Sequence, residues 1–525
     1  MTAHDARRGS RPAPEREEQE GQERQGAAPG EGRRLFSSGS ALILGRLTTA
    51  TFGWAGSVIM ARSLTGEEWG QYSFVFALLG ILDVVTDLGV GRVVLARLGS
   101  GRAAEVSRIA GSFIMLRILL GFLGYLIAVA YVYLAGLSVL VLTAAVLAGT
   151  TVLLATPANA LFVLYQSRLR LTYVAVWDII GQCVQFLLIV LVALTAPGVL
   201  AFILPAIVRE IVIIIGRGIG VPKLFAPGFR PSFRSFTAYW GEMLREAVPI
   251  SIGLALLTML ERIDTLMLEQ LDTYGAVGQY AIGYKFSDLL WLVVSALAIP
   301  FTTVLIRAWP HDPETFRARF HQALSVAAVL GGGAVVVFWP SAAAVITLLY
   351  GSDYLASATA AALLVTGSAL SGLNYVVVTA LIAATRLRVF PWLAAAGLVL
   401  NVALNLVLIP LRSIEGAAIA TVITQVVVLV AMLLLLRGSL RIPGITPWSV
   451  LLRLSLLSAA VAVPAVLLVG ELRVPGVPAA VGAGLVYLLL VAATERRATT
   501  VIWRHLRARL RPGPTAAQEG EPDAS

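Results

Sequence analysis

Four charged residues near the middle of the chain lie inside runs of apolar residues. Arg262 and Asp264 fall in one run, and Lys285 and Asp288 fall in the next. A charged side chain in hydrocarbon costs at least about 2.5–3.5 kcal/mol, so such residues usually face a partner or a water-filled cavity. Arginine binds phosphate through two parallel hydrogen bonds, and lysine adds a point charge. The stretch therefore predicts either charges paired with one another or a water-filled cavity whose cations could bind an anion.

Arg262 and Lys285 are expected at comparable depths on neighbouring helices. Arg262 lies about 15 residues into its run, roughly 22 Å from one end at the rise of an α-helix. Lys285 lies about 9 residues into a helix that runs back, roughly 14 Å from the opposite end. A structural alternative stays open, because Lys285 and Asp288 are three residues apart and can neutralise each other.

Two arginines of the first half are further candidates for binding the anion. Arg117 is expected at mid-depth, where it lines the cavity or pairs with a buried acid. Arg46 lies near the inner end of the first apolar run. It can meet the anion on entry, or extend toward lipid phosphate as long basic side chains do.

Acidic residues inside the apolar runs are candidates for coupling to protons or cations. Asp83 and Asp87 are four residues apart and share one helix face. They can carry the coupling ion or act as partners of Arg117. Asp264 is a comparable candidate in the second half, and Asp178 is expected as an isolated acid.

Composition predicts an all-α membrane protein with many spans. Of 525 residues, 58% are hydrophobic and 13% charged, against about 25% charged in soluble domains. A span needs about 20 apolar residues, and fourteen runs meet this length. They are 40–61, 70–90, 109–134, 138–165, 171–195, 198–216, 247–268, 276–305, 321–349, 355–384, 389–410, 414–436, 447–470 and 474–494.

The basic residues predict the orientation of these spans. One set of connections carries eighteen Arg or Lys, and the alternate set carries only Arg62, Arg412 and Arg473. The positive-inside rule assigns the basic set to the cytoplasm, with both termini on that side of the cell (inner) membrane. The net charge of +10 thus follows from topology, and no nucleic-acid partner is expected.

An internal repeat divides the chain. Gly70-Gln71-Tyr72 returns as Gly278-Gln279-Tyr280, 208 residues later. Six spans in each half make the repeat parallel, with two similar lobes around a central cavity and an axis along the membrane normal. We expect a disordered cytoplasmic tail (1–34), an N-lobe (35–216), a cytoplasmic linker (217–246), a C-lobe (247–437), two further spans (438–494) and a cytoplasmic tail (495–525).

The sequence contains no pattern of residues that is typical of an enzyme active site. Cys183 is the single cysteine, and the four histidines show no metal-ligand spacing. No Walker motif or Ser/His/Asp set stands out, so we expect no catalytic residue, metal or cofactor. An ion gradient, the membrane potential or product consumption must then drive any transport.

Several motifs together resemble a known family. They are Ala61–Tyr72 followed by Asp87-Leu88-Gly89, then Leu349–Tyr354, and Asn401–Pro410 followed by Gly416–Thr421. Their order and spacing resemble the bacterial oligosaccharide and polysaccharide flippases of the multidrug/oligosaccharidyl-lipid/polysaccharide (MOP) exporter superfamily. The resemblance covers residues 40–437. It implies two six-helix lobes, alternating access and a polyprenyl-diphosphate-linked oligosaccharide as cargo for envelope polysaccharide synthesis.

Other functions remain as alternatives. A cation-coupled drug or metabolite antiporter on the same scaffold should have an acidic cavity, whereas the central stretch carries both signs. A lipid II flippase shares the fourteen-helix plan. A membrane glycosyltransferase or polymerase needs a sizeable outer loop, which this chain lacks, although such enzymes are possible partners of a flippase.

Overall fold

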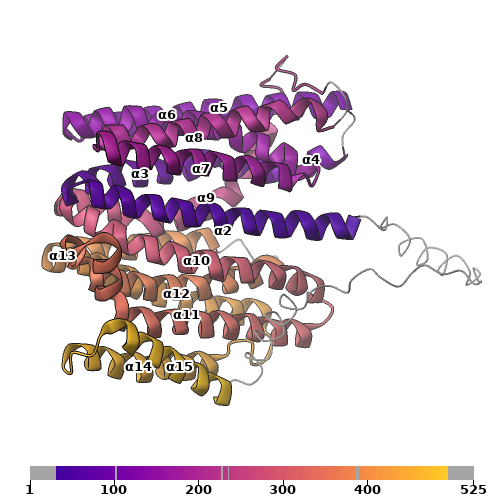
Figure 1. Cartoon of the computed structure of the whole chain (residues 1–525). Coiled ribbons are helices and arrows are strands. Elements are labelled where there is room, and N and C mark those ends of the chain that lie inside the picture. Colours follow the sequence, from indigo (N-terminus) through magenta and orange to yellow (C-terminus); the bar gives the residue numbers. More distant parts are fainter. Residues whose placement is uncertain (1–30, 101–102, 226–228, 235, 385–389, 495–525) are drawn as a thin grey trace, which may run out of the picture.

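The computed structural model describes residues 31–100, 103–225, 229–234, 236–384 and 390–494, which form helices joined by short connections. The helices lie side by side as one bundle (Figure 1). The first half contains α2 (Glu31–Ser63), α3 (Gly66–Asp87), α4 (Val90–Ser100), α5 (Ala103–Leu134), α6 (Val139–Ser167), α7 (Leu171–Thr195), α8 (Val199–Gly220) and the short 3-10 helix η1 (Val221–Lys223). The second half contains α9 (Trp240–Leu271), α10 (Tyr274–Ala308), α11 (Pro313–Tyr350), η2 (Ser352–Tyr354), α12 (Ser357–Ala383), α13 (Phe390–Leu440), α14 (Trp448–Gly470) and α15 (Gly476–Thr494).

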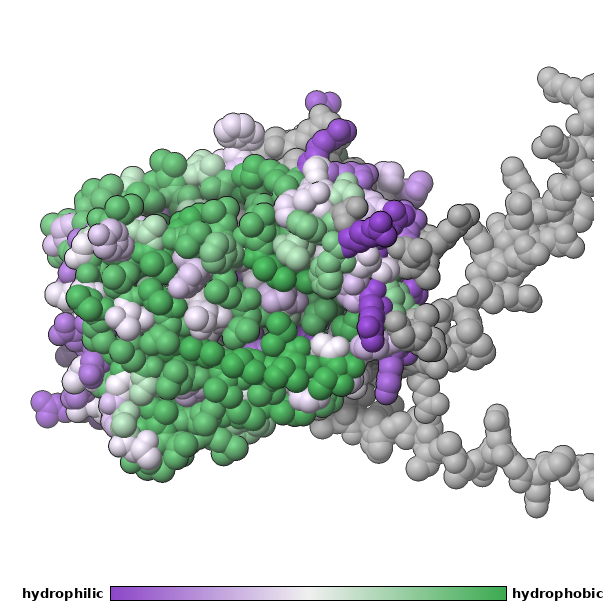
Figure 2. Space-filling model, turned by 90° about the horizontal axis from the view of Figure 1, so that it is seen from above, coloured by the Kyte–Doolittle hydropathy of each residue, from purple (hydrophilic) through white to green (hydrophobic). Residues whose placement is uncertain are grey.

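The surface of the bundle is suited to lipid. Within the described residues, nine helices are long and apolar enough to cross a membrane, or ten if the two bent parts of α9 form one span. Large apolar side chains such as Leu187, Leu194 and Leu489 are more than half exposed. Figure 2 shows a mainly hydrophobic face, with hydrophilic residues gathered toward the two ends of the bundle. The expected class, an all-α multi-pass membrane protein, is confirmed.

Matching threonine caps begin α3 and α10. Thr65 accepts a hydrogen bond from the backbone N–H of Glu68, and the Glu68 carboxylate accepts one from the Thr65 N–H at 2.9 Å. Thr273 caps α10 by accepting from the N–H of Ala276 at 3.2 Å. These side chains satisfy backbone donors that a helix start leaves free. The two threonines stand 208 residues apart, in the register of the Gly-Gln-Tyr repeat.

The repeated glycines form a reciprocal contact between α3 and α10. A Cβ at Gly70 would lie 1.7 Å from the carbonyl oxygen of Tyr274, and a Cβ at Gly278 would lie 2.4 Å from that of Gly66. Each glycine therefore touches the residue four positions before the other glycine. Only glycine permits this approach, and the first turns of the two helices meet at the same end of the bundle.

Two breaks in helical geometry interrupt the chain. Beyond α3, Leu88 and Gly89 have φ of 46° and 57°, which ends the helix before α4 starts. Within α13, Arg412 and Ser413 leave helical geometry, with φ of −142° and 49°. The second break lies between the runs expected at 389–410 and 414–436.

The two halves pack mainly within themselves and meet along α3, α9 and α10. The packing of α2 on α7 and of α5 on α6 in the first half is repeated by α9 on α13 and α11 on α12 in the second. Both α14 and α15 pack against α11. Larger contacts between the halves join α3 to α10, α3 to α9 and α4 to α9.

Polar contacts tie the halves together at both ends of the bundle. At the end where α3 and α10 begin, Arg62 donates to the carbonyl oxygens of Leu348 and Leu349, each at 2.7 Å. At the opposite end, Arg97 of α4 lies 2.8 Å from Glu242 and 2.7 Å from Glu246, both on α9. Both sets of contacts join the first half of the chain to the second.

The connection between α8 and α9 is bound to the first half along part of its length. The Ser232 N–H donates to the Ser107 carbonyl at 2.9 Å, and the Ser107 hydroxyl donates to the Arg230 carbonyl at 2.6 Å. At its end, the Trp240 indole donates to the Ser112 carbonyl at 3.0 Å. The first turns of α5 thus position this segment.

Several boundaries differ from the sequence expectations. Residues 31–34, expected in the disordered tail, form the first turn of α2. The expected linker starts inside α8, which continues to Gly220, and ends inside α9. The rest of the N-terminal tail (1–30) and the C-terminal tail (495–525) lie outside the described residues.

Candidate functional site

Arg262 and Asp288 form an ion pair between α9 and α10. The guanidinium Nη2 of Arg262 lies 2.9 Å from Asp288 Oδ1. The guanidinium carbon, Cζ, lies 4.6 Å from the ring centroid of Tyr284. The Arg262 side chain is 35% exposed and that of Asp288 is 49% exposed. Both charged groups therefore stay partly accessible while they pair with each other.

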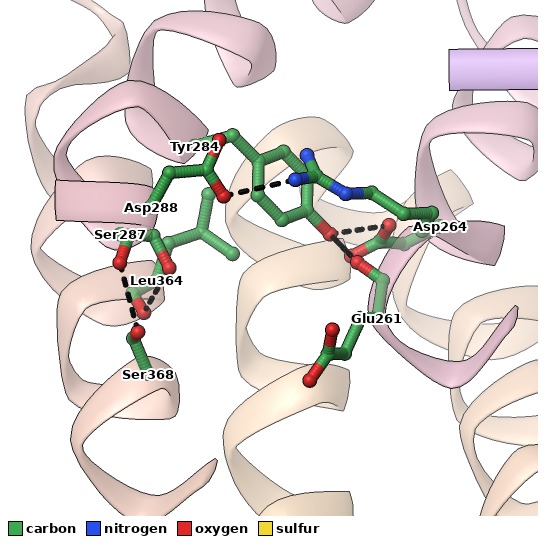
Figure 3. Close-up of polar contacts among 8 residues, drawn as sticks. Glu261, Asp264, Tyr284, Ser287, Asp288, Leu364 and Ser368 are labelled. Atoms are coloured by element: carbon green, nitrogen blue, oxygen red, sulfur yellow. Dashed lines mark hydrogen bonds and ion pairs between the residues drawn. The ribbon is translucent and has the colours of Figure 1, made fainter. Parts of the chain in front are cut away.

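Asp264 lies deeper and is surrounded by hydrogen-bond donors. Tyr284 donates to both carboxylate oxygens at 2.7 Å, Tyr280 donates at 2.5 Å and Thr421 of α13 donates at 3.2 Å. The backbone N–H of Thr265 adds a bond of 2.8 Å. Asp264 has no exposed surface. This carboxylate joins α9, α10 and α13, as the dashed lines around Asp264 and Tyr284 in Figure 3 show in part.

Lys285 reaches across the boundary between the halves. Its ammonium lies 5.9 Å from the ring centroid of Trp69 on α3 and makes no ion pair or hydrogen bond with the described residues. The sequence left open a pair between Lys285 and Asp288. Asp288 pairs with Arg262 instead, which leaves Lys285 without a carboxylate partner among the described residues.

Arg117 is paired with Asp87, one of the two acids that share a face of α3. The Arg117 side chain is 2% exposed, and that of Asp87 is 49% exposed. The buried guanidinium thus depends on a carboxylate that also faces open space. Asp83 lies one turn earlier on α3, and Arg117 is near enough to interact with its charge.

Arg46 lines a different cavity, of about 250 Å³, between α2, α6, α7 and α8. Its guanidinium makes no ion pair or hydrogen bond with the described residues. On the cavity wall, Arg217 lies 2.6 Å from Asp178 and donates to the Ala158 carbonyl at 2.7 Å. This polar cavity carries one unpaired cation beside one neutralised pair.

The candidates therefore fall into three groups. Arg262 and Asp264 of α9 both contact Tyr284 of α10, whereas Lys285 of α10 extends to Trp69 of α3. Arg117 and Asp87 join α5 to α3. Arg46 lines the cavity in the first half, whose lining includes none of the other predicted cations. Among the described residues, no group of three or more His, Cys, Asp and Glu could hold a metal ion.

Sequence reasoning misplaced or missed several polar residues. Arg217 was expected in the cytoplasmic linker, and Asp178 was expected to be isolated. They are partners, because α8 extends past the expected end of its span and carries Arg217 to 6% exposure beside Asp178. Tyr284 was also missed, although its spacing of four residues from Tyr280 predicts a shared face.

Comparisons with known proteins place this geometry in context. A family model described as "Polysaccharide biosynthesis protein" matches residues 35–306. No curated protein matches the chain in sequence. The fold is similar to the inward closed conformation of the lipid II flippase MurJ, with a TM-score of 0.68 and 16% identity over 87% of this chain and 98% of that one.

Two further solved structures share the fold. An inward-facing multidrug resistance MATE family transporter of the MOP superfamily has a TM-score of 0.63 and 14% identity over 75% of this chain and 96% of that one. A MOP superfamily transporter from Pyrococcus furiosus, described as having a binding pocket of reverse polarity, has a TM-score of 0.58 and 13% identity over 78% and 95%. At these identities the likeness concerns the fold alone.

Proposed function

The chain belongs to the polysaccharide biosynthesis protein family, a transporter family of the MOP superfamily, and from this premise we propose that it is a flippase for lipid-linked oligosaccharide. The cargo is a polyprenyl-diphosphate-linked glycan, which crosses the cytoplasmic membrane for envelope polysaccharide biosynthesis. Glycosyltransferases supply such a cargo and a polysaccharide polymerase consumes it, so these enzymes are the proposed partners.

The observation that carries this proposal is a pair of cations without carboxylate partners. Lys285 of α10 and Arg46 of α2 make no ion pair with the described residues, and they lie in separate parts of the bundle. Within a membrane an unpaired charge is costly. A diphosphate would compensate that cost with charge-assisted hydrogen bonds, and Arg262 could add a bidentate contact if its pair with Asp288 opened.

The proposed architecture has fourteen spans in two lobes. Helices from α2 to α8 make the N-lobe (35–216) and helices from α9 to α13 make the C-lobe (247–437), with α13 contributing two spans and α14 and α15 following. The reciprocal Gly70–Gly278 contact supports a two-fold axis along the membrane normal. The basic connections support cytoplasmic termini.

Transport then proceeds by alternating access. The diphosphate and its sugars enter from the cytoplasmic side once the Arg97 contacts to Glu242 and Glu246 open. The prenyl tail stays in the lipid. Rocking of the lobes closes that end and separates Arg62 from the end of α11. Because the head group is then exposed on the other side, it can leave toward the polymerase.

Coupling to an ion is proposed for Asp83, Asp87 and Asp264. A proton on Asp87 would release the buried charge of Arg117, and a proton on Asp264 would remove acceptors from Tyr280 and Tyr284. Either event changes the packing of a helix that contacts the other lobe. Binding of the ion would thereby bias the two conformations.

Thiol labelling tests the proposed site. A cysteine at 285, in a Cys183→Ser background, should react with a water-soluble thiol reagent. A cysteine at Leu489, 71% exposed on α15, is the control and should stay inert. Inertness of the cysteine at 285 would contradict the assignment.

A further inference from the structure

The connection between α8 and α9 carries basic and aromatic side chains and no acid. Residues 221–240 contain three basic residues, six aromatic residues and neither Asp nor Glu. Arg230 and Arg234 are exposed, and their guanidinium groups make no hydrogen bond or ion pair with the described residues. We call the described residues 229–234 and 236–240 the strap. Its positive charge is therefore not neutralised by the part of the chain that the structure describes.

The strap is held in one place on the first turns of α5. In addition to the backbone bonds described above, the Phe236 carbonyl accepts a hydrogen bond from the Ser112 hydroxyl. A Cβ at Gly111 would lie 2.0 Å from the Ser232 carbonyl oxygen, so only glycine lets the strap lie this close to α5. The Phe229 ring is buried in a cluster shared with α5 and α9. The strap is thus a fixed part of the surface of the bundle.

The strap covers the same face of α5 that is exposed to lipid farther along the helix. Gly111 and Ile118 are seven residues apart and share a helix face, as do Ser112 and Leu119. Ile118 is 40% exposed and Leu119 is 48% exposed. The exposed apolar residues of α5 extend from Ile118 to Leu134, about 24 Å of helix beside hydrocarbon about 30 Å thick. The strap lies about two turns before Ile118, which places it at the depth of the lipid head groups.

Two aromatic side chains of the strap are exposed at this depth. Phe233 is 48% exposed and Phe236 is 38% exposed. Arg234 lies between them in the sequence, and Arg230 lies three residues before Phe233. Exposed rings beside basic residues are typical of segments that lie in the membrane interface, where the rings reach the acyl boundary and the cations meet anionic lipid. The strap therefore combines both kinds of contact that such a segment makes.

We propose that the strap binds anionic phospholipids of the membrane face at which α9 begins. Arg230 and Arg234 contact the lipid phosphates, and the Phe233 ring inserts beside the acyl chains. The charge favours anionic over zwitterionic head groups, because basic residues near the membrane are attracted by a negative surface potential. An acidic protein would match the charge, but it would not explain exposed phenyl rings beside the lipid-facing stripe of α5. This binding does not depend on transport of glycolipid.

Hydrogen exchange of the strap in the full chain tests this surface. The chain is placed in nanodiscs of phosphatidylcholine alone, or of equal parts phosphatidylcholine and phosphatidylglycerol. The attraction of two arginines to the anionic surface should slow exchange of the strap amides about 30-fold. The double variant Arg230→Gln/Arg234→Gln should lose this difference, and so should wild type at high salt, because salt screens exposed charges. The matched control Arg319→Gln/Arg437→Gln removes two exposed arginines of the second half and should keep the difference.

The variant Phe233→Ala tests the apolar part of the contact without changing the charge. Exchange of the strap should quicken in both kinds of nanodisc, while the difference between them remains. The proposal is overturned if wild type exchanges equally in both lipids, or if Arg230→Gln/Arg234→Gln keeps the lipid difference. Equal slowing by soluble polyglutamate in phosphatidylcholine nanodiscs would also overturn it, because that result assigns the surface to an acidic protein. No cargo is present, so each outcome is independent of whether the chain transports glycolipid.

Discussion

Replacing Lys285 with glutamine separates cargo binding from folding. Lys285 has no carboxylate partner among the described residues, so glutamine strands no acid and removes a desolvated charge. Folding loses only the contact with Trp69, worth about 0.5–1 kcal/mol where partly exposed. One charge-assisted contact to a diphosphate is worth about 1.5–3 kcal/mol, so affinity should fall roughly 10- to 150-fold.

The assay is calorimetric titration of the full chain in nanodiscs with farnesyl diphosphate, alongside thermal unfolding of the same sample. The matched control is Lys223→Gln, which changes the chain's other lysine, exposed in η1. Its affinity should equal that of wild type. Wild-type diphosphate affinity in folded Lys285→Gln protein refutes the reasoning, and an equal loss in Lys223→Gln would reveal a general charge effect.

Three further predictions concern contacts between helices. Asp87→Asn should destabilise the fold by about 3 kcal/mol, more than Arg117→Gln does, because it strands a guanidinium that is 2% exposed, and thermal unfolding measures the difference. Gly70→Ala should lower thermal stability, since its Cβ would overlap a backbone carbonyl of α10. The hydrogen bond from Arg97 lowers the pKa of the Glu242 carboxyl. Their contact is therefore fully present above the ordinary carboxyl pKa, and it is lost as the pH falls through the lowered pKa of Glu242. Hydrogen exchange of residues 240–246 should therefore quicken at acid pH.

Each of these has a control and a contrary outcome. Gly66→Ala adds a methyl group that meets no atom within 4 Å and should be neutral. If Gly66→Ala and Gly70→Ala unfolded at the same temperature, the close contact between Gly70 and α10 would be contradicted. If Arg117→Gln destabilised the fold more than Asp87→Asn does, the expected order of the two variants would be wrong. If hydrogen exchange of residues 240–246 did not change with pH, the proposed role of Arg97 in joining α4 to α9 would be contradicted. The same holds if the Arg97→Gln variant showed the same increase at acid pH.

The helical class and the positions of most helices could be predicted from the sequence, because hydrocarbon thickness sets the length of an apolar run. The break at Arg412 and Ser413 followed from the same rule. Side-chain partners could not be predicted in this way. Asp288 bonds Arg262 on another helix and not Lys285 on its own, a choice made by the way α9 packs beside α10.

Arg217 is a second residue whose partner could not be predicted from the sequence. Hydropathy ended its span early because a charge appeared, yet α8 continues and buries that charge beside Asp178, 39 residues away.

Translocation by the purified chain tests the central claim most directly. Full-length protein is reconstituted in liposomes with a fluorescent polyprenyl-diphosphate-linked oligosaccharide, and a membrane-impermeant reductant reports how fast label from the inner leaflet appears outside. We predict rapid appearance with the wild-type chain and a much slower rate with Lys285→Gln, while Lys223→Gln matches wild type. A wild-type rate equal to that of protein-free liposomes would contradict the account.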